Sequence, residues 1–237
     1  MSCMPARNTR AGYQDAFWSS QYSTDPEFFG RVESPFSHWA MRLMKRDGVS
    51  SALELGFGYG RDTGYLLASG ISVTGVEVSS RGYELAAERF RGVPGVRLHH
   101  SDALSFLRSM AGASMDAVYS NLFFNMHFTR AEHRALMLEI ERVLSEGGLN
   151  LFSARSTNDP WYGKGRQVGP GTFDHSPQGT TMVYFSARLV KGITPPGLKT
   201  ILLEERTEGE GDFPISVLYV CQKRSAVRGN AVPTPLP

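Results

Sequence analysis

The fold of this chain is decided by the stretch Ala52-Leu53-Glu54-Leu55-Gly56-Phe57-Gly58-Tyr59-Gly60. Its apolar first half predicts a short buried strand, and its second half predicts a turn with glycine at every second position. Glycine tolerates positive φ and has no Cβ, so the backbone of such a turn can approach a ligand closely. Glu54 lies two places before the first glycine. We expect its carboxylate at the end of the strand, near a cationic or hydroxyl-bearing group of a ligand.

The glycine spacing separates two ligand classes. A dinucleotide site requires G-x-G-x-x-G, but here Arg61 holds the third position and the glycine falls one residue earlier, at Gly60. The pattern E-x-G-x-G-x-G resembles motif I of the class I S-adenosylmethionine (SAM) methyltransferases. Glycine amides at a helix N-terminus favour a pyrophosphate, whereas SAM has no phosphate and its amino group suits a neighbouring acid. A glycine-rich turn without a ligand is the other interpretation of this motif taken alone.

Two further acids lie at the ends of predicted strands. Residues 72–78 predict the second strand, which carries Glu77, 21 residues beyond Gly56. In Rossmann-type folds an acid about 20 residues after the glycine turn binds ribose hydroxyls. Residues 96–101 predict the third strand, and Asp102 follows it. In the methyltransferases that the chain resembles, an acid at this place contacts the adenine amino group.

Two later segments extend the resemblance. Residues 115–121 predict a fourth strand ending at Asn121, and Arg142-Val143-Leu144-Ser145-Glu146-Gly147-Gly148 resembles the turn that precedes strand five in the family. The resemblance is strong over residues 34–156 and looser over the C-terminal strands. It implies an α/β fold with a doubly wound, seven-stranded, mainly parallel sheet in the order 3-2-1-4-5-7-6. The last strand is expected to be antiparallel, and helices are expected on both faces.

Local signals mark several elements. Ser34-Pro35 supplies a cap and a proline for the first turn of a helix. Thr129 and Glu132 have the spacing of a capping box. Residues 148–154 predict the fifth strand, and residues 199–206 and 215–223 predict a closing pair of strands rich in β-formers.

The chain length of 237 residues predicts a single domain. We divide it into an aromatic N-terminal lid segment (1–33), a core (34–224) that contains a substrate flap (155–184), and a disordered tail (225–237). Residues 1–11 are also expected to be disordered. The flap follows strand five, at the edge where α/β sheets bind ligands, and a loop of that length usually has a task. A surface excursion without function is the alternative.

The resemblance implies a site built from seven cofactor-binding residues, namely Glu54, Gly56, Gly58, Gly60, Glu77, Asp102 and Asn121. Asn121 holds the position that begins the N-P-P-Y motif of amino-group methyltransferases. Here the sequence is N-L-F-F, which argues against a nucleic-acid adenine as the target. The predicted cofactor is SAM.

Residues that contact the methyl acceptor are predicted on the flap and on the loop after the fourth strand (residues 121–128), here called the fourth loop. A hydroxyl nucleophile needs a base, and the candidates are His127 and the pair Asp174–His175. The predicted substrate-binding residues are aromatic: Phe123, Phe124, Trp161, Tyr162 and Phe173. A structural role is the alternative for each histidine. The six histidines lack metal-ligand spacing, so no metal is predicted.

Composition excludes several classes of function. The net charge of +2, from 25 basic and 23 acidic residues, is too weak and too evenly spread to indicate a nucleic-acid partner. No apolar run is long enough to predict a membrane span. The two cysteines, Cys3 and Cys221, have neither the spacing of metal ligands nor that of a disulfide framework. We therefore expect free thiols and a cytoplasmic location. A monomer and a homodimer are equally compatible with the sequence.

We therefore predict a SAM-dependent methyltransferase that acts on an N, O or S atom of a small aromatic or heterocyclic metabolite, in secondary metabolism or detoxification. Two alternatives remain open. One is an NAD-dependent oxidoreductase, and the other is a SAM-binding protein without catalytic activity.

Overall fold

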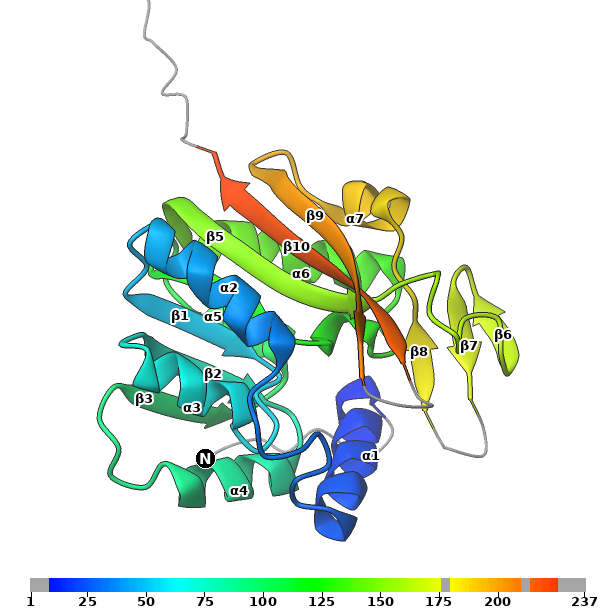
Figure 1. Cartoon of the computed structure of the whole chain (residues 1–237), viewed down its shortest axis with the longest axis horizontal. Helices are drawn as coiled ribbons and strands as arrows, with labels where there is room; N and C mark the ends of the chain where they lie inside the picture. The colour runs from blue at the N-terminus through cyan, green and yellow to red at the C-terminus, as the bar shows by residue number, and fades with distance from the viewer. Residues whose placement is uncertain (1–8, 176–179, 210–213, 226–237) are drawn as a thin grey trace, which may run out of the picture.

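The computed structural model describes residues 9–175, 180–209 and 214–225. Its centre is a seven-stranded sheet in the order β3-β2-β1-β4-β5-β10-β9 (Figure 1). The strands are β1 (Ser51–Leu55), β2 (Ser72–Glu77), β3 (Val96–His100), β4 (Met115–Ser120), β5 (Leu144–Arg155), β9 (Leu198–Glu208) and β10 (Ile215–Arg224). Only β10 runs antiparallel to its neighbours. The predicted doubly wound sheet and its strand order are confirmed.

Helices cover both faces of this sheet, as predicted (Figure 1). On one face α2 (Pro35–Arg46) and α3 (Arg61–Ala68) pack over a buried apolar cluster. On the other face the cluster is covered by α5 (Ala103–Ser109), α6 (Arg130–Val143) and α7 (Ala187–Ile193). Alternate strand residues point to opposite faces, so the central strands β1, β2, β4, β5 and β10 contribute to both apolar layers.

The predicted helix signals operate as expected. The Ser34 hydroxyl accepts a hydrogen bond from the Ser37 N–H at 3.1 Å, and α2 begins at Pro35. At α6 the reciprocal bonds between Thr129 and Glu132 complete the capping box. The fifth strand is longer than predicted and begins at Leu144, because the segment after α6 pairs with Met115 of β4.

The N-terminal segment contains a helix that the sequence analysis missed. Residues 9–11 are ordered, because Thr9 caps α1 (Arg10–Thr24). The expectation of disorder is therefore wrong for these three residues, and residues 1–8 lie outside the described ranges. Of its aromatic residues, Tyr22 is buried and Phe17 and Trp18 are half-buried, whereas Tyr13 is exposed. The helix is therefore held by contacts of one face with the rest of the protein.

Helix α1 is anchored to α4 (Ser80–Arg89) by an acid. The Asp15 carboxylate accepts hydrogen bonds from the backbone N–H of Ser80 at 2.8 Å and from its hydroxyl at 2.9 Å. At a second point the Trp18 Nε1–H lies 3.1 Å from the Met126 sulfur. In Figure 1 α1 (dark blue) stands between α4 and β8 in the view.

The flap is more regular than a loop. It contains a three-stranded antiparallel sheet of β6 (Arg166–Gly169), β7 (Thr172–Asp174) and β8 (Thr181–Val183). Short strands separated by glycine and proline give no long alternating pattern, so the sequence analysis did not find them. The predicted disordered tail lies outside the described residues except for Ser225. Within the described residues, the structure has no helix long and apolar enough to cross a bilayer.

Candidate functional site

A cavity of about 570 Å³ opens where the parallel strands end. Its floor includes residues at or just beyond the ends of four strands, namely Gly56, Glu77, Asp102 and Asn121. Its walls are largely aromatic, with Phe17, Trp18 and Tyr22 from α1, Phe28 and Phe29 from the next loop, and Phe123. Met182 of β8 closes the flap side. Lid and flap therefore both contribute to one cavity.

A smaller chamber of about 60 Å³ shares part of this lining, including Gly56 and Asn121, and reaches Glu54 and Gly58. The two chambers bring together every predicted cofactor residue except Gly60, which underlies the turn as the residue preceding α3. The three glycines have φ values of +72°, +58° and +81°, in the left-handed region that favours glycine.

The neighbours of the glycine turn explain its lack of side chains. A Cβ built at Gly58 would lie 2.7 Å from the Tyr22 hydroxyl, and one built at Gly56 would lie 3.0 Å from Phe123. At Gly60 the added atom would collide with the Phe90 ring. Glycine is therefore required in this turn for two reasons. One is the close approach of a ligand, and the other is the packing of protein side chains, including Tyr22 of the lid, against the turn.

The Glu77 carboxylate holds the turn in place. One oxygen accepts the N–H of Gly58 at 2.8 Å and the other accepts the N–H of Ser79 at 2.7 Å. Burial raises the pKa of Glu77, and these backbone donors oppose that change. The backbone of Val78 acts on the carboxylate in the same way, and Glu77 also lines the cavity, where a ligand hydroxyl can reach it.

Asp102 occupies the matching position after β3. Its Oδ1 accepts the N–H of Ser105 at 2.9 Å and caps α5. The residue lines the cavity close to Ser101, whose N–H donates to the Glu77 carbonyl at 3.0 Å. The two predicted ligand-binding acids are thus fixed side by side at the ends of adjacent strands.

Glu54 lies beneath the turn, in the smaller chamber. It is 3 % exposed, and the Thr63 hydroxyl donates to its Oε2 at 2.7 Å. Burial raises its pKa to about 8. A carboxyl group in this state is largely protonated at neutral pH, so it becomes a strong ligand for a cation only when a cation enters the chamber and lowers that pKa.

An acid that the sequence analysis missed organises the same region. The Asp62 carboxylate accepts hydrogen bonds from the Ser34 N–H at 2.8 Å, the Tyr119 hydroxyl at 2.7 Å and the Asn121 amide at 3.2 Å. It joins the starts of α2 and α3 to the end of β4. The side chain of Asn121 is fixed at both ends, because the Ser153 hydroxyl donates to its oxygen. The sequence signal that could have identified Asp62 is its position, two residues after Gly60, the last glycine of the motif.

On the acceptor side, Phe123 lines the cavity, whereas Phe124 is fully buried in the core against Phe152. His127 is not part of the cavity wall. Burial, with a smaller contribution from Arg10, lowers its pKa. The structure therefore separates these three neighbours, and only Phe123 faces the space where an acceptor would lie.

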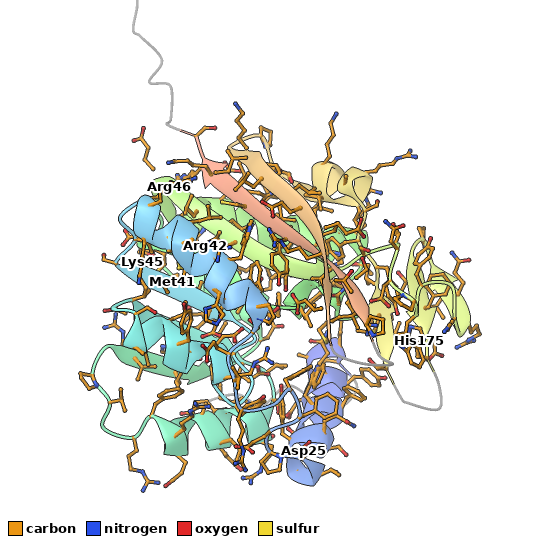
Figure 2. The ribbon with its side chains drawn as sticks, in the orientation of Figure 1. Asp25, Met41, Arg42, Lys45, Arg46 and His175 are labelled. Atoms are coloured by element: carbon orange, nitrogen blue, oxygen red, sulfur yellow. The ribbon has the colours of Figure 1, made fainter. Side chains whose placement is uncertain are left out.

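The flap residues gather around Tyr184 rather than in the cavity lining. The Tyr184 hydroxyl lies 2.9 Å from Nε2 of His175, and Trp161 meets the His175 ring edge-on. Tyr162 and Phe173 make further edge-on contacts with the Tyr184 ring. Figure 2 shows His175 at the flap end of the molecule. Asp174 forms an ion pair with Arg166 at 3.1 Å. The catalytic roles of Asp174, His175 and His127 stay predictions.

Some cavity residues carried no recognisable signal in the sequence. Arg155 closes β5 and forms a two-point ion pair with Asp159, at 2.9 and 2.8 Å. Glu208 closes β9 and faces the same cavity. Within the described residues, no three His, Cys, Asp or Glu side chains are grouped to hold a metal ion.

Comparison with known proteins agrees with this geometry. Residues 52–148 match the family model described as "Methyltransferase domain". This segment is therefore a methyltransferase domain, and the strand order of the sheet is that of the class I SAM-dependent methyltransferase fold. The matched region of the methyltransferase domain runs from β1 into β5 and contains all seven predicted cofactor residues. No curated protein sequence matches the chain.

Three solved structures resemble the methyltransferase along most of its length. The Burkholderia thailandensis 1,6-didemethyltoxoflavin-N1-methyltransferase has 16% identity and a TM-score of 0.67, over 95% of this chain and 93% of its own. The N-methyltransferase NodS of Bradyrhizobium japonicum has 16% identity and a TM-score of 0.65, over 90% and 100%. The [4+2]-cyclase SpnF has 16% identity and a TM-score of 0.64, over 95% and 100%. At these identities the similarity establishes the fold alone.

Proposed function

We propose that this protein transfers the methyl group of SAM to a nitrogen, oxygen or sulfur atom of a small aromatic or heterocyclic molecule. The observation that carries the proposal is the single cavity that joins the acids Glu77 and Asp102 to an aromatic chamber beneath the lid and the flap. Such a chamber fits a small planar molecule and would exclude a polymer. The similar structure of the 1,6-didemethyltoxoflavin-N1-methyltransferase, with 1,6-didemethyltoxoflavin bound, is consistent with a small acceptor.

The residues present fit SAM. The Glu77 carboxylate at the end of β2 suits the ribose hydroxyls, and Asp102 suits the adenine amino group. Glu54 and the backbone of the glycine turn border the smaller chamber, which suits the amino acid end of the molecule. When bound, SAM supplies an electrophilic methyl group on a sulfonium.

The protein's own contribution is alignment and exclusion of water. Trp18 and Tyr22 cover the cavity from α1, which is tied to α4 through Asp15 and to the fourth loop through Met126. These ties hold the aromatic wall in position over the glycine turn, so that an acceptor beneath it would be shielded from bulk solvent.

The proposal extends to the location and role of the protein. A cytoplasmic location agrees with Cys221 being a buried free thiol. We propose a role in secondary metabolism or detoxification, and the aromatic chamber supports it because it suits a small planar acceptor. Glu54, Gly56, Gly58, Gly60, Glu77, Asp102 and Asn121 are proposed as cofactor-binding residues, and Phe123 as the acceptor-binding residue of the fourth loop.

The direct test is mass spectrometry of a panel of aromatic amines, phenols, thiols and nitrogen heterocycles after incubation with methyl-labelled SAM and the protein. The proposal predicts a label on at least one class. SpnF shows that this fold also occurs in a cyclase, so SAM that binds but is never consumed would indicate a use of the cofactor other than methyl transfer. A thermal-shift comparison of SAM with NAD separates both from an oxidoreductase.

A further inference from the structure

Glu208 places a carboxylate in the cavity on a strand that carries none of the predicted cofactor acids. It is the last residue of β9, at the edge of the sheet opposite β3. Its register partner on β10 is Ile215, which also lines the cavity. In the sheet order, β1, β4, β5 and β10 lie between β9 and β2, which carries Glu77. We therefore assign Glu208 to the acceptor end of the chamber.

The described basic residues around the cavity form no ion pair with this acid. Two arginines, Arg61 and Arg155, line the same space. Each has an acid of its own outside that lining: Asp62 lies 3.4 Å from Arg61, and Asp159 forms the two-point pair with Arg155. The lining carboxylates therefore give the cavity a negative character, which favours a cationic or hydrogen-donating ligand.

Among the described residues, one hydrogen bond to the Glu208 carboxylate is found, and it reaches only one of the two oxygens. The Tyr219 hydroxyl donates to Oε1, and no ion pair to Glu208 occurs within the described ranges. Arg61 and Asp62 of α3 act on it only over a longer range, with opposite effects, and burial raises its pKa. Residues 210–213, with sequence EGDF, contain no basic side chain. A half-buried carboxylate with one neutral donor is costly, and a ligand that donates to Oε2 would offset that cost.

We propose that Glu208 binds the reacting amine of the acceptor, and hence that the acceptor is a small ring-bearing amine. This inference rests on the proposed function. The aromatic wall from Trp18 and Phe29 would surround the ring and favour a nearby cation, while Glu208 orients the N–H. When the nitrogen forms its bond to the methyl carbon, the methyl–sulfur bond breaks and sulfur keeps the electron pair. The proton leaves nitrogen for Oε2 of Glu208 and passes to solvent.

The test uses the full chain and two matched probes, benzylamine and benzyl alcohol, titrated calorimetrically with and without S-adenosylhomocysteine (SAH). The variants are Glu208→Gln and the control Glu204→Gln, an acid on the same strand that pairs with Arg206 and does not line the cavity. We expect the wild type and the control to bind benzylamine ~10- to 100-fold more tightly than benzyl alcohol, the range for a hydrogen bond to a charged group. Glu208→Gln should abolish that preference without changing SAH affinity or the thermal midpoint.

Several outcomes would overturn the inference. One is equal or undetectable binding of the two probes by the wild type. Another is a loss of SAH affinity in Glu208→Gln, which would assign the carboxylate to the cofactor. A third is a preference that survives in Glu208→Gln but disappears in His127→Ala. Wild-type protein that prefers benzylamine yet binds no SAH would refute the proposed function while leaving the amine site supported.

Discussion

Replacing Gly58 by alanine tests how tightly the lid is pressed on the glycine turn. Gly58 has φ +58°, and a left-handed conformation costs a residue with a Cβ about 1–2 kcal/mol. The new atom would also lie 2.7 Å from the Tyr22 hydroxyl. Displacing a buried ring of this kind costs about 1–3 kcal/mol. The two effects together predict a loss of about 2–5 kcal/mol in the free energy of unfolding.

The two contributions separate in a double-mutant cycle with Tyr22→Phe. Without the hydroxyl, the nearest ring atom to the new Cβ is Tyr22 Cζ, at an ordinary 3.4 Å, so only the backbone strain should remain. Urea unfolding should then give a coupling energy of about 1–3 kcal/mol. Gly48→Ala is the matched control, because Gly48 has φ +69° and its Cβ would meet nothing within 4 Å. It should cost about 1–2 kcal/mol and be indifferent to Tyr22→Phe. A Gly58→Ala loss that is the same in both Tyr22 backgrounds would refute the docking of α1 described above.

Three further predictions concern titration and the lid. Burial raises the pKa of Glu54 to about 8, so the folded state keeps a proton that the unfolded chain releases near pH 4.3. The free energy of unfolding should therefore fall as the pH rises from about 4.3 to 8, by up to about 1.4 kcal/mol per pH unit. Urea unfolding of Glu54→Gln at a series of pH values should lack this decline. The same decline in the variant as in the wild type would exclude Glu54 as its source. Asp15→Ala removes the acceptor for Ser80, so amide hydrogen exchange should quicken in α1 while the sheet is unaffected; equal protection of α1 would contradict its anchoring role. Tyr219→Phe removes the donor to Glu208 and should raise the pKa of that carboxyl further, moving the acid limb of the turnover profile to higher pH; a shift toward lower pH would oppose this assignment.

Much of the fold was predictable because its signals are local. Serine before Pro35 and the Thr129 capping box fix helix starts through bonds that span only a few residues. The acids at Glu77 and Asp102 follow strands whose order is set by right-handed crossovers, so their meeting at one edge also followed from the sequence. These are the features that the structure confirms most closely.

The parts that could not be predicted depend on contacts between distant segments. Helix α1 is stabilised by the contact of its Asp15 with Ser80 of α4 and by the contact of its Trp18 with Met126. Neither contact can be inferred from the sequence of α1 alone. Phe123 and Phe124 are neighbours of the same type, yet a turn of the backbone directs one to the cavity and the other to the core. Glu208 lies at the cavity because β9 pairs with β10 at the edge of the sheet, and this pairing joins segments that are separate in the sequence.

The central claim is that SAM lies on the acids at the ends of β2 and β3. It is tested most directly by calorimetric titration of SAM, SAH and NAD into the wild type and Glu77→Gln. A glutamine can offer only one acceptor oxygen where two backbone N–H groups now bind. The account predicts that the wild type binds SAM and SAH but not NAD, and that Glu77→Gln weakens both by ~10-fold or more, the equivalent of about 1.4 kcal/mol. Unchanged SAH affinity in Glu77→Gln, or wild-type protein that binds NAD in place of SAH, would contradict it.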